Sequence, residues 1–442
     1  MTAKPIFRTA RLATLVALAV GAGAPAFAQS LRDLYEAARA FDATYLAARA
    51  TAQSAEYRVA QSEALLKPSA ALTGSATAMQ LDLPIVGTGD SNTVQGALSG
   101  RYPLFNRASQ ATVAQARKSM DVARADLDAA EQDLIVRVSQ AYFDVLAAQD
   151  TLATTQASKK AITEQLASAK RNFEVGTATI TDTREAQARF DLVTAQELAA
   201  ENDLRTKRIA LDQLVGRSGV QPRPLLTPVV LPPVAPASPD EWVSNADLAH
   251  PLVRKARVGL DVALLETEKA RAAEKPTLDA VGSLGSSRAS GSSVAVRGTT
   301  TSASVGLQLN WPLYTGGATQ NRIKETLVLE DKARNDLEAA RRGIAQATRV
   351  AYFGVQSGQA QVKALEAAEA STKLALEATE LGYKVGVRVN LDVLNAQTQL
   401  YQTQRDLAKA RYDVLVGGLR LRQAAGQLSA SDVEALNRLV AP

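Results

Sequence analysis

Cysteine is absent from this chain of 442 residues, and histidine occurs once, at His250. Without cysteine the protein has no disulfides, no thiolate metal ligands, no thiol nucleophile and no lipid-modified cysteine. A single histidine also argues against a histidine-based metal cluster or catalytic triad. The segment Gly87-Thr88-Gly89-Asp90 is an isolated glycine turn, and nothing around it forms a phosphate-binding loop. We therefore expect no enzymatic activity, no cofactor and no metal site.

Long apolar runs are confined to the N-terminus. Basic residues at Lys4, Arg8 and Arg11 precede an apolar stretch over 12–24, and Ala-Phe-Ala follows at 26–28. This pattern predicts a secretory signal peptide and an exported mature chain. The three cations supply part of the formal net charge of +5, so the charge does not indicate nucleic-acid binding. After residue 28 no run of about 18 apolar residues occurs, so any segment that spans a membrane would have to be a β-strand.

Proline is missing from two long stretches, 104–221 and 313–441. Because proline costs about 3 kcal/mol inside a helix and both stretches are rich in good helix formers, each predicts very long helices. We expect a helical hairpin in each stretch, turning at Gly176 and Gly386. The returning helix of the second hairpin carries a large apolar residue every seven positions, which is typical of knobs-into-holes packing between helices: Val393, Leu400, Leu407, Val414 and Leu421.

The second half of the chain repeats the first at an offset of about 210 residues. The matching segments, in the same order in both halves, are Lys67-Pro68 and Lys275-Pro276, Tyr102-Pro103-Leu104-Phe105 and Trp311-Pro312-Leu313-Tyr314, Ala141-Tyr142-Phe143 and Ala351-Tyr352-Phe353, and Phe173-Glu174-Val175-Gly176 and Tyr383-Lys384-Val385-Gly386. Conserved order and nearly constant spacing indicate one architectural unit built twice.

Segments of alternating apolar and polar residues precede both helical stretches. The alternation is clearest where Val305, Leu307 and Leu309 share one face. About ten alternating residues with an aromatic at one end are typical of transmembrane β-strands, and a half-buried sheet in a soluble protein is the open alternative. The expected strands are about 69–83, 93–104, 277–287 and 301–313.

These patterns predict the organisation of the whole chain. We expect a signal peptide at 1–28, a first repeat at 29–219 with its hairpin at about 107–215, a Pro-rich linker at 220–240, a second repeat at 241–428 with its hairpin at about 317–423, and a C-terminal tail at 429–442. Seven prolines in the linker indicate a surface strap between the repeats. Because four strands are too few to enclose a lumen, several chains would have to pool their strands.

With its signal peptide, duplicated strand–helix units, Pro-Leu-aromatic joints and Val-Gly turns, the chain resembles the TolC family of outer-membrane efflux proteins. The resemblance implies an α+β membrane protein in which three chains, four strands each, form a 12-stranded outer-membrane β-barrel. This barrel would continue into a long periplasmic α-helical barrel with a small mixed equatorial region. The implied partners are two further copies in a homotrimer, outer-membrane lipid, a periplasmic adaptor and an inner-membrane ABC or proton-driven pump.

The resemblance also implies a gate at the periplasmic tip. Tyr383 and Arg388 match family residues that hydrogen-bond the neighbouring hairpin, and Asp182 and Thr181 match their partners. The family's tip turns meet the adaptor, and the corresponding residues here are Gly176, Thr177, Gly386 and Val387.

Asp392 matches a family residue that forms an acidic ring at the pore constriction. The family often has a second aspartate one turn later, and this chain has Asn395 there. Three carboxylates, one from each chain, would still concentrate negative potential in a narrow neck and attract cations. Taken alone, Asp392 is equally well interpreted as a carboxylate stabilised by the start of a helix.

The resulting functional hypothesis is an exit duct of a tripartite export system, passing proteins by type I secretion and/or small toxic compounds from an inner-membrane pump to the exterior. The alternative is a periplasmic coiled-coil adaptor or a surface fibre without a pore. That alternative places Val305, Leu307 and Leu309 in a water-soluble core. The sequence does not specify the cargo.

Overall fold

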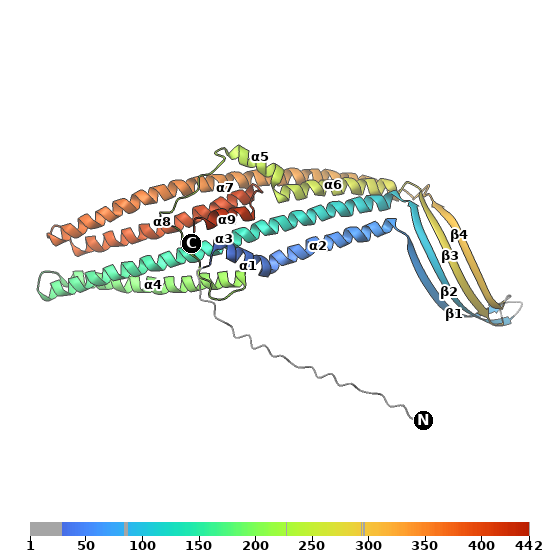
Figure 1. Ribbon diagram of the computed structural model, residues 1–442, viewed down its shortest axis with the longest axis horizontal. Helices are drawn as coiled ribbons and strands as arrows, with labels where there is room; N and C mark the ends of the chain where they lie inside the picture. Colours follow the sequence, from blue (N-terminus) through green and yellow to red (C-terminus); the bar gives the residue numbers. More distant parts are fainter. Residues whose placement is uncertain (1–28, 84–86, 227, 293, 295–296, 442) are drawn as a thin grey trace, which may run out of the picture.

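The computed structural model describes residues 29–83, 87–226, 228–292, 294 and 297–441. The predicted signal peptide at 1–28 lies outside the described residues. Figure 1 shows an elongated molecule in which long helices form one arm and a four-stranded sheet curves away from one end.

Two very long helices run the length of the arm, one in each repeat: α3 (Arg107–Glu174) and α7 (Ala318–Lys384). Both lie in the proline-free stretches, where no residue removes a backbone donor or blocks the helical path. Asn106 starts α3 because its side-chain Oδ1 accepts a hydrogen bond from the backbone N–H of Ser109 at 2.9 Å. The predicted helical stretches are therefore helical over nearly their whole length.

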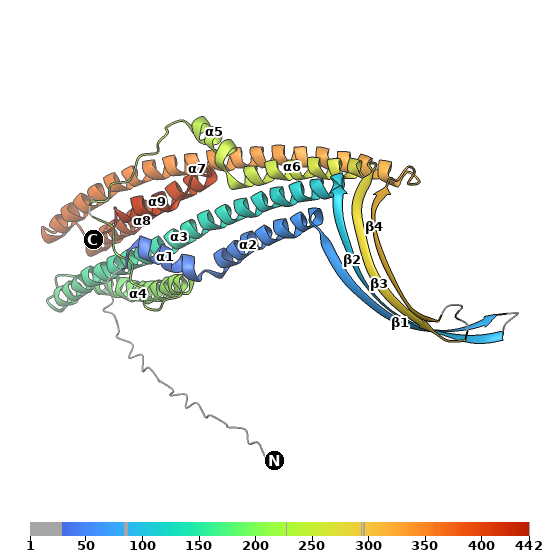
Figure 2. The same ribbon diagram turned by 45° about the vertical axis from the view of Figure 1, so that its right-hand side comes forward.

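Shorter helices pack along these two. α4 (Ile180–Val215) and α8 (Asn390–Ala424) return from the tips to the middle of the arm. α2 (Ala43–Glu63) and α6 (Pro251–Ala272) continue from there toward the sheet (Figure 2). Each half of the arm thus consists of one continuous helix packed against two shorter helices that follow each other along it.

The sheet is antiparallel throughout, with the strand order β1-β2-β3-β4. Its strands are β1 (Ser69–Leu83), β2 (Gly87–Phe105), β3 (Thr277–Ser290) and β4 (Gly298–Asn310). β2 begins at Gly87 and not at residue 93, because pairing with β1 continues to the Leu83–Gly87 pair whatever the side-chain pattern. β4 ends at Asn310, ahead of the proline at 312, which has no N–H to donate to a ladder. Because β2 and β3 belong to different repeats, the sheet joins the two halves of the chain.

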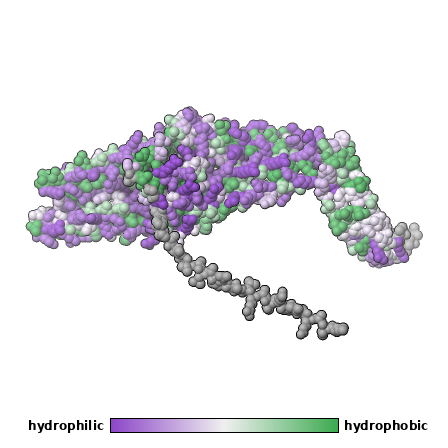
Figure 3. Space-filling model, viewed as in Figure 1, coloured by the Kyte–Doolittle hydropathy of each residue, from purple (hydrophilic) through white to green (hydrophobic). Residues whose placement is uncertain are grey.

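The two faces of the sheet differ in polarity. The register places Leu72, Leu98, Leu284 and Ala303 in one row across the four strands. The next row, on the other face, is Ala71, Ser99, Ser283 and Ser304. Strands that separate lipid from a polar interior have this division. In Figure 3, hydrophobic patches lie among residues of intermediate hydropathy on the visible part of the sheet, whereas hydrophilic residues dominate the middle of the helical arm.

The main hydrophobic core lies in the middle of the arm. It combines α3, α4 and α8 with two short helices, α1 (Leu31–Phe41) and α9 (Ala430–Asn437). Tyr142 and Phe143 are fully buried there, with their rings edge to face at 5.4 Å. Their counterparts in the second repeat, Tyr352 and Phe353, keep the same spacing and orientation. These helices and the linker form the equatorial region.

The Pro-rich linker is held by equivalent residues of the two repeats. The hydroxyl of Tyr142 donates a hydrogen bond to the carbonyl oxygen of Arg223 at 2.8 Å. The hydroxyl of Tyr352 donates in the same way to the carbonyl oxygen of Ala237. The predicted strap at 220–240 is therefore fastened near both ends, and α5 (Pro239–Ala249) follows it.

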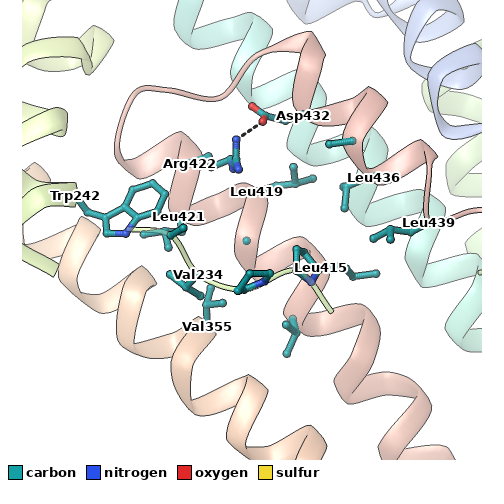
Figure 4. Close-up of a pocket in the computed structure, with 16 residues that line it drawn as sticks. Val234, Trp242, Val355, Leu415, Leu419, Leu421, Arg422, Asp432, Leu436 and Leu439 are labelled. Carbon is teal, nitrogen blue, oxygen red and sulfur yellow. Dashed lines mark hydrogen bonds and ion pairs between the residues drawn. The ribbon is translucent and has the colours of Figure 1, made fainter. Parts of the chain in front are cut away.

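A cavity of about 200 Å³ lies between this strap and the ends of α8 and α9 (Figure 4). Val234, Trp242 and Leu415 are among its mostly apolar lining residues. The charged pair Arg422 and Asp432 lies at its edge, where each residue neutralises the other. The cavity is therefore a hydrophobic space within the equatorial packing.

Candidate functional site at the hairpin tips

Both helical hairpins turn at the end of the arm farthest from the sheet (Figure 1). Gly176 and Gly386 have φ values of 77° and 81°, a conformation that strains any residue with a Cβ. In each turn the glycine N–H and the next N–H bond back to the last helical turn, as in a Schellman motif. The donor–acceptor distances are 3.0 and 2.8 Å in the first turn and 3.1 and 2.9 Å in the second. The predicted contact residues Gly176, Thr177, Gly386 and Val387 are all exposed.

Both returning helices carry an aspartate as their third residue. The carboxylate of Asp182 accepts hydrogen bonds from the backbone N–H and the hydroxyl of Thr179, at 3.0 and 2.8 Å. The carboxylate of Asp392 accepts from the N–H of Val389 at 3.4 Å and lies 3.7 Å from the guanidinium of Arg388. Both carboxylates therefore stabilise the starts of their own helices, where the helix dipole favours negative charge.

The structure gives the predicted gate residues different partners within one chain. The hydroxyl of Tyr383 accepts a hydrogen bond from Nδ2 of Asn172 at 3.2 Å. Among the described residues no hydrogen bond or ion pair joins Tyr383 or Arg388 to Asp182 or Thr181. Because Asp182 caps α4 and Arg388 faces Asp392, the pairing implied by the resemblance is not formed inside a single chain.

The predicted constriction residues lie one helical turn apart at the start of α8. Asp392 is partly exposed, and Asn395 is exposed. The Oδ1 of Asn395 accepts a hydrogen bond from the guanidinium of Arg189 on α4 at 2.9 Å. Asn395 therefore contributes a contact between the hairpins in place of a second charge.

Sequence reasoning missed three amide residues at the tips. Gln165 and Asn172 of α3 and Asn390 of α8 all bond across from one hairpin to the other. Neutral amides follow no periodic pattern, so their partners are not apparent from the sequence. The one available signal is that Asn390 lies one turn before Leu394, on the side of α8 that packs inward.

The single histidine has a structural place. His250 is buried at the start of α6, where its Nδ1 accepts a hydrogen bond from the N–H of Leu252 at 3.1 Å. Burial lowers the pKa of His250 because the charged imidazolium would lose its hydration.

Among the described residues no cluster of three or more His, Cys, Asp or Glu is suited to hold a metal ion. No helix in the described ranges has the length and apolar character needed to cross a membrane.

Comparison with known proteins gives consistent matches along the chain. The family model described as "Outer membrane efflux protein" matches residues 34–217 and again residues 242–427, one match for each repeat. The outer membrane protein TolC of Vibrio cholerae serotype O1 is 32% identical, over 98% of this chain and 97% of that protein. The alkaline protease secretion protein AprF of Pseudomonas aeruginosa is 35% identical, over 78% of this chain and 72% of that protein.

Solved structures show the same fold at lower identity. The outer membrane protein VceC of Vibrio cholerae superposes with a TM-score of 0.76 at 19% identity, covering 90% of this chain and 96% of VceC. The outer-membrane channel OprN superposes with a TM-score of 0.77 at 18% identity, covering 90% of each chain.

Proposed function

The chain belongs to the outer membrane efflux protein family, and we propose that it forms the exit duct of an export system completed by a periplasmic adaptor and an inner-membrane pump. The protein is an outer-membrane channel with a long periplasmic extension. The duct carries proteins, as in type I secretion, and/or small toxic compounds. It is passive, and an ABC or proton-driven pump supplies the energy.

The observation that carries this proposal is the sheet, which has one apolar face, one polar face and two unpaired edges. β1 and β4 each have one neighbour within the chain, so one ladder of backbone groups on each is open. Open edges are not tolerated in lipid, where unpaired N–H and C=O groups cost several kcal/mol each. Three chains would supply three times four strands, twelve in all, and β1 of one chain would pair with β4 of the next.

The helical arm supports the same assembly. α3 buries many side chains within the chain, whereas α7 leaves large apolar residues exposed along its length. Val328, Val350, Leu374 and Leu381 are each more than half exposed. In a trimer these side chains would pack against the hairpin of the neighbouring chain, which would close the helices into a tube.

The sheet argues against a soluble adaptor or fibre. That reading required Val305, Leu307 and Leu309 to lie in a core, but they are 94%, 70% and 64% exposed. They lie on the apolar face of β4, which suits contact with lipid.

The gate completes the proposal. Tyr383 and Arg388 of one chain would bond Asp182 and Thr181 of the next, and three copies of Asp392 would face one another in the neck. Because position 395 is asparagine, the neck would contain three carboxylates, one from each chain. An aspartate at this position would give six. The exposed turns at Gly176 and Gly386 would contact the adaptor. Contacts with the adaptor would then replace the contacts that hold the tip closed.

Purified protein in planar lipid bilayers tests this function. We expect a heat-resistant trimer in detergent and a small, cation-selective conductance. Asp392→Ala should reduce the cation selectivity severalfold, because the neck loses its carboxylates. Asp406→Ala, on an exposed part of α8 well away from the neck, is the matched control and should leave selectivity unchanged. A monomer without conductance would contradict the proposal.

A further inference from the structure

Four side-chain hydrogen bonds tie the two hairpins of one chain together near the tips. Each joins a residue of the first hairpin to one of the second: Asn172 to Tyr383, Gln165 to Asn390, Asn390 to the backbone of Asp182, and Arg189 to Asn395. None of the four is a bond between two charged groups. The contacts that hold the hairpins in register are therefore mostly made by amide and phenol groups.

Asn390 differs from the others because it makes two of these bonds and is buried, with only 2% of its surface exposed. The Nε2 of Gln165, on α3, donates to the Oδ1 of Asn390. The Nδ2 of Asn390 donates in turn to the carbonyl oxygen of Asp182, on α4, at 3.4 Å. One amide thus connects the first residue of α8 to both helices of the first hairpin.

Apolar packing continues from this amide into the first hairpin. Leu394 lies one turn farther along α8, on the same side, and is completely buried. It packs in a cluster with Ile162 and Leu166 of α3 and Ala186 and Val193 of α4. The start of α8 therefore packs against both α3 and α4 through Leu394, and the amide of Asn390 closes this contact on the side of the tip.

We propose that Asn390 is a positioning residue of the gate, because its amide must release both Gln165 and Asp182 before α8 can move away from the first hairpin. The proposal rests on the proposed function, in which the tip opens. It adds a contact within each chain to the contacts between chains. Since the amide carries no charge, this contact is insensitive to salt and to pH, unlike a charged pair at the tip.

The burial of Asn390 makes its release cooperative. Moving α8 outward breaks two hydrogen bonds and withdraws Leu394 from its cluster in the same step. A buried donor or acceptor left without a partner is costly, so a half-released state is disfavoured. An adaptor that opens the tip has to hydrate this amide or replace its partners.

Two substitutions at this position separate the gate role from a structural one. Asn390→Leu removes both bonds and places an apolar side chain of similar size beside Leu394, so we expect conductance in planar bilayers to rise by roughly tenfold. The trimer's thermal dissociation temperature should stay the same or increase, because the site gains apolar contact and the released groups of Gln165 and Asp182, both partly exposed residues, can bond to water. If Asn390 had only a structural role, Asn390→Leu would lower the thermal dissociation temperature along with any rise in conductance.

Asn390→Asp gives the second measurement. At neutral pH its carboxylate still accepts from Gln165 but cannot donate to the carbonyl of Asp182, so the conductance should be raised. Protonation restores the donor, so the excess over the unmodified protein should vanish in acid. Measuring both proteins at each pH removes the effects of pH that they share, including any from the nearby charged residues Asp182, Asp392 and Arg388. The conductance of Asn390→Leu should exceed that of the unmodified protein at every pH.

Gln402→Leu is the matched control, because Gln402 is an exposed amide whose hydrogen bonds stay within α8. It should leave the conductance unchanged. If Asn390→Leu and Asn390→Asp both conduct like the unmodified channel at neutral pH, Asn390 does not hold the gate. If the unmodified protein itself forms no channel, the proposed function fails instead.

Discussion

Asn172 and Tyr383 are 211 positions apart in sequence, and the amide of Asn172 donates a hydrogen bond to the hydroxyl of Tyr383 at 3.2 Å. Tyr383 is the repeat counterpart of Phe173, the residue next to Asn172. The bond therefore joins nearly equivalent points of the two copies, at the ends of α3 and α7. The first copy has phenylalanine at this point and the second has tyrosine, so only the second copy supplies the hydroxyl that this bond requires.

Removing the hydroxyl of Tyr383 tests this bond together with the bond proposed from Tyr383 to the next chain. We expect Tyr383→Phe to raise the conductance of purified trimers by at least roughly two- to tenfold, the effect of losing one neutral hydrogen bond. The fold should be unchanged because the ring remains. Tyr57→Phe, at an exposed tyrosine on α2, serves as the control. An unchanged conductance for Tyr383→Phe would show that the bond does not restrain the tip.

The glycine turns predict a graded series of stability effects. Gly176 and Gly386 have open space where a Cβ would stand, so alanine at either should cost about 1–2 kcal/mol from backbone strain alone. At Gly426 the φ value is also positive, but a Cβ would lie 2.4 Å from the Cα of His250. Gly426→Ala should therefore lower the thermal dissociation temperature of the trimer much more than Gly176→Ala or Gly386→Ala. Equal effects at all three positions would contradict this account.

The ion pair between Arg101 and Asp279 joins β2 to β3, and so joins the first repeat to the second. The guanidinium Nη2 lies 2.6 Å from Oδ2 of Asp279, whose side chain is only 7% exposed. Arg101→Ala should destabilise the trimer by about 1–3 kcal/mol, because it leaves a buried carboxylate unpaired. Adding Asp279→Asn should recover part of this loss, as measured by thermal dissociation. A double variant less stable than Arg101→Ala would rule out this explanation.

Asp150 predicts a pH dependence of stability in the equatorial core. Its Oδ2 accepts a hydrogen bond from the hydroxyl of Tyr412 at 2.7 Å, and burial raises the pKa of Asp150 because the carboxylate loses hydration. A carboxyl whose pKa is raised on folding favours the folded state in acid. This advantage is lost as pH rises from the unfolded pKa through the folded pKa.

The corresponding test is Asp150→Asn, which keeps an acceptor for Tyr412 and removes the titration. The variant should be more stable than the unmodified protein at neutral pH, and the difference should shrink in acid. Thermal dissociation measured from acid to neutral pH is the readout. A difference that grows as the pH falls would have the wrong sign.

The strands show how much of the secondary structure the local side-chain pattern can predict. Alternation predicts a strand at 93–104, but β2 begins at Gly87, where glycine and polar residues show no alternation. The extra residues are strand because β1 offers them backbone partners, a condition set by the neighbouring strand and not by their side chains. The predicted tail at 429–442 likewise contains α9, whose Val433 and Leu436 are buried against the equatorial core.

The tip shows the same limit for the candidate site. Resemblance implied roles for Tyr383 and Arg388, and the glycine turns located the tip correctly in space. The resemblance did not indicate that Asp182 would cap its own helix through Thr179. It also gave no reason to expect a bond between Gln165 and Asn390, which lie 225 positions apart.

The sequence by itself determined the long helices, the two glycine turns and the duplicated strand pairs. Proline exclusion, positive φ and side-chain alternation are local properties that each segment carries wherever it lies. Only the tertiary structure decided which helices pack side by side and which neutral side chains meet across the hairpins. An amide can bond any donor or acceptor within reach, so the partner of Asn390 depends on the packing of Leu394 against α3 and α4. That packing is a property of the two hairpins together.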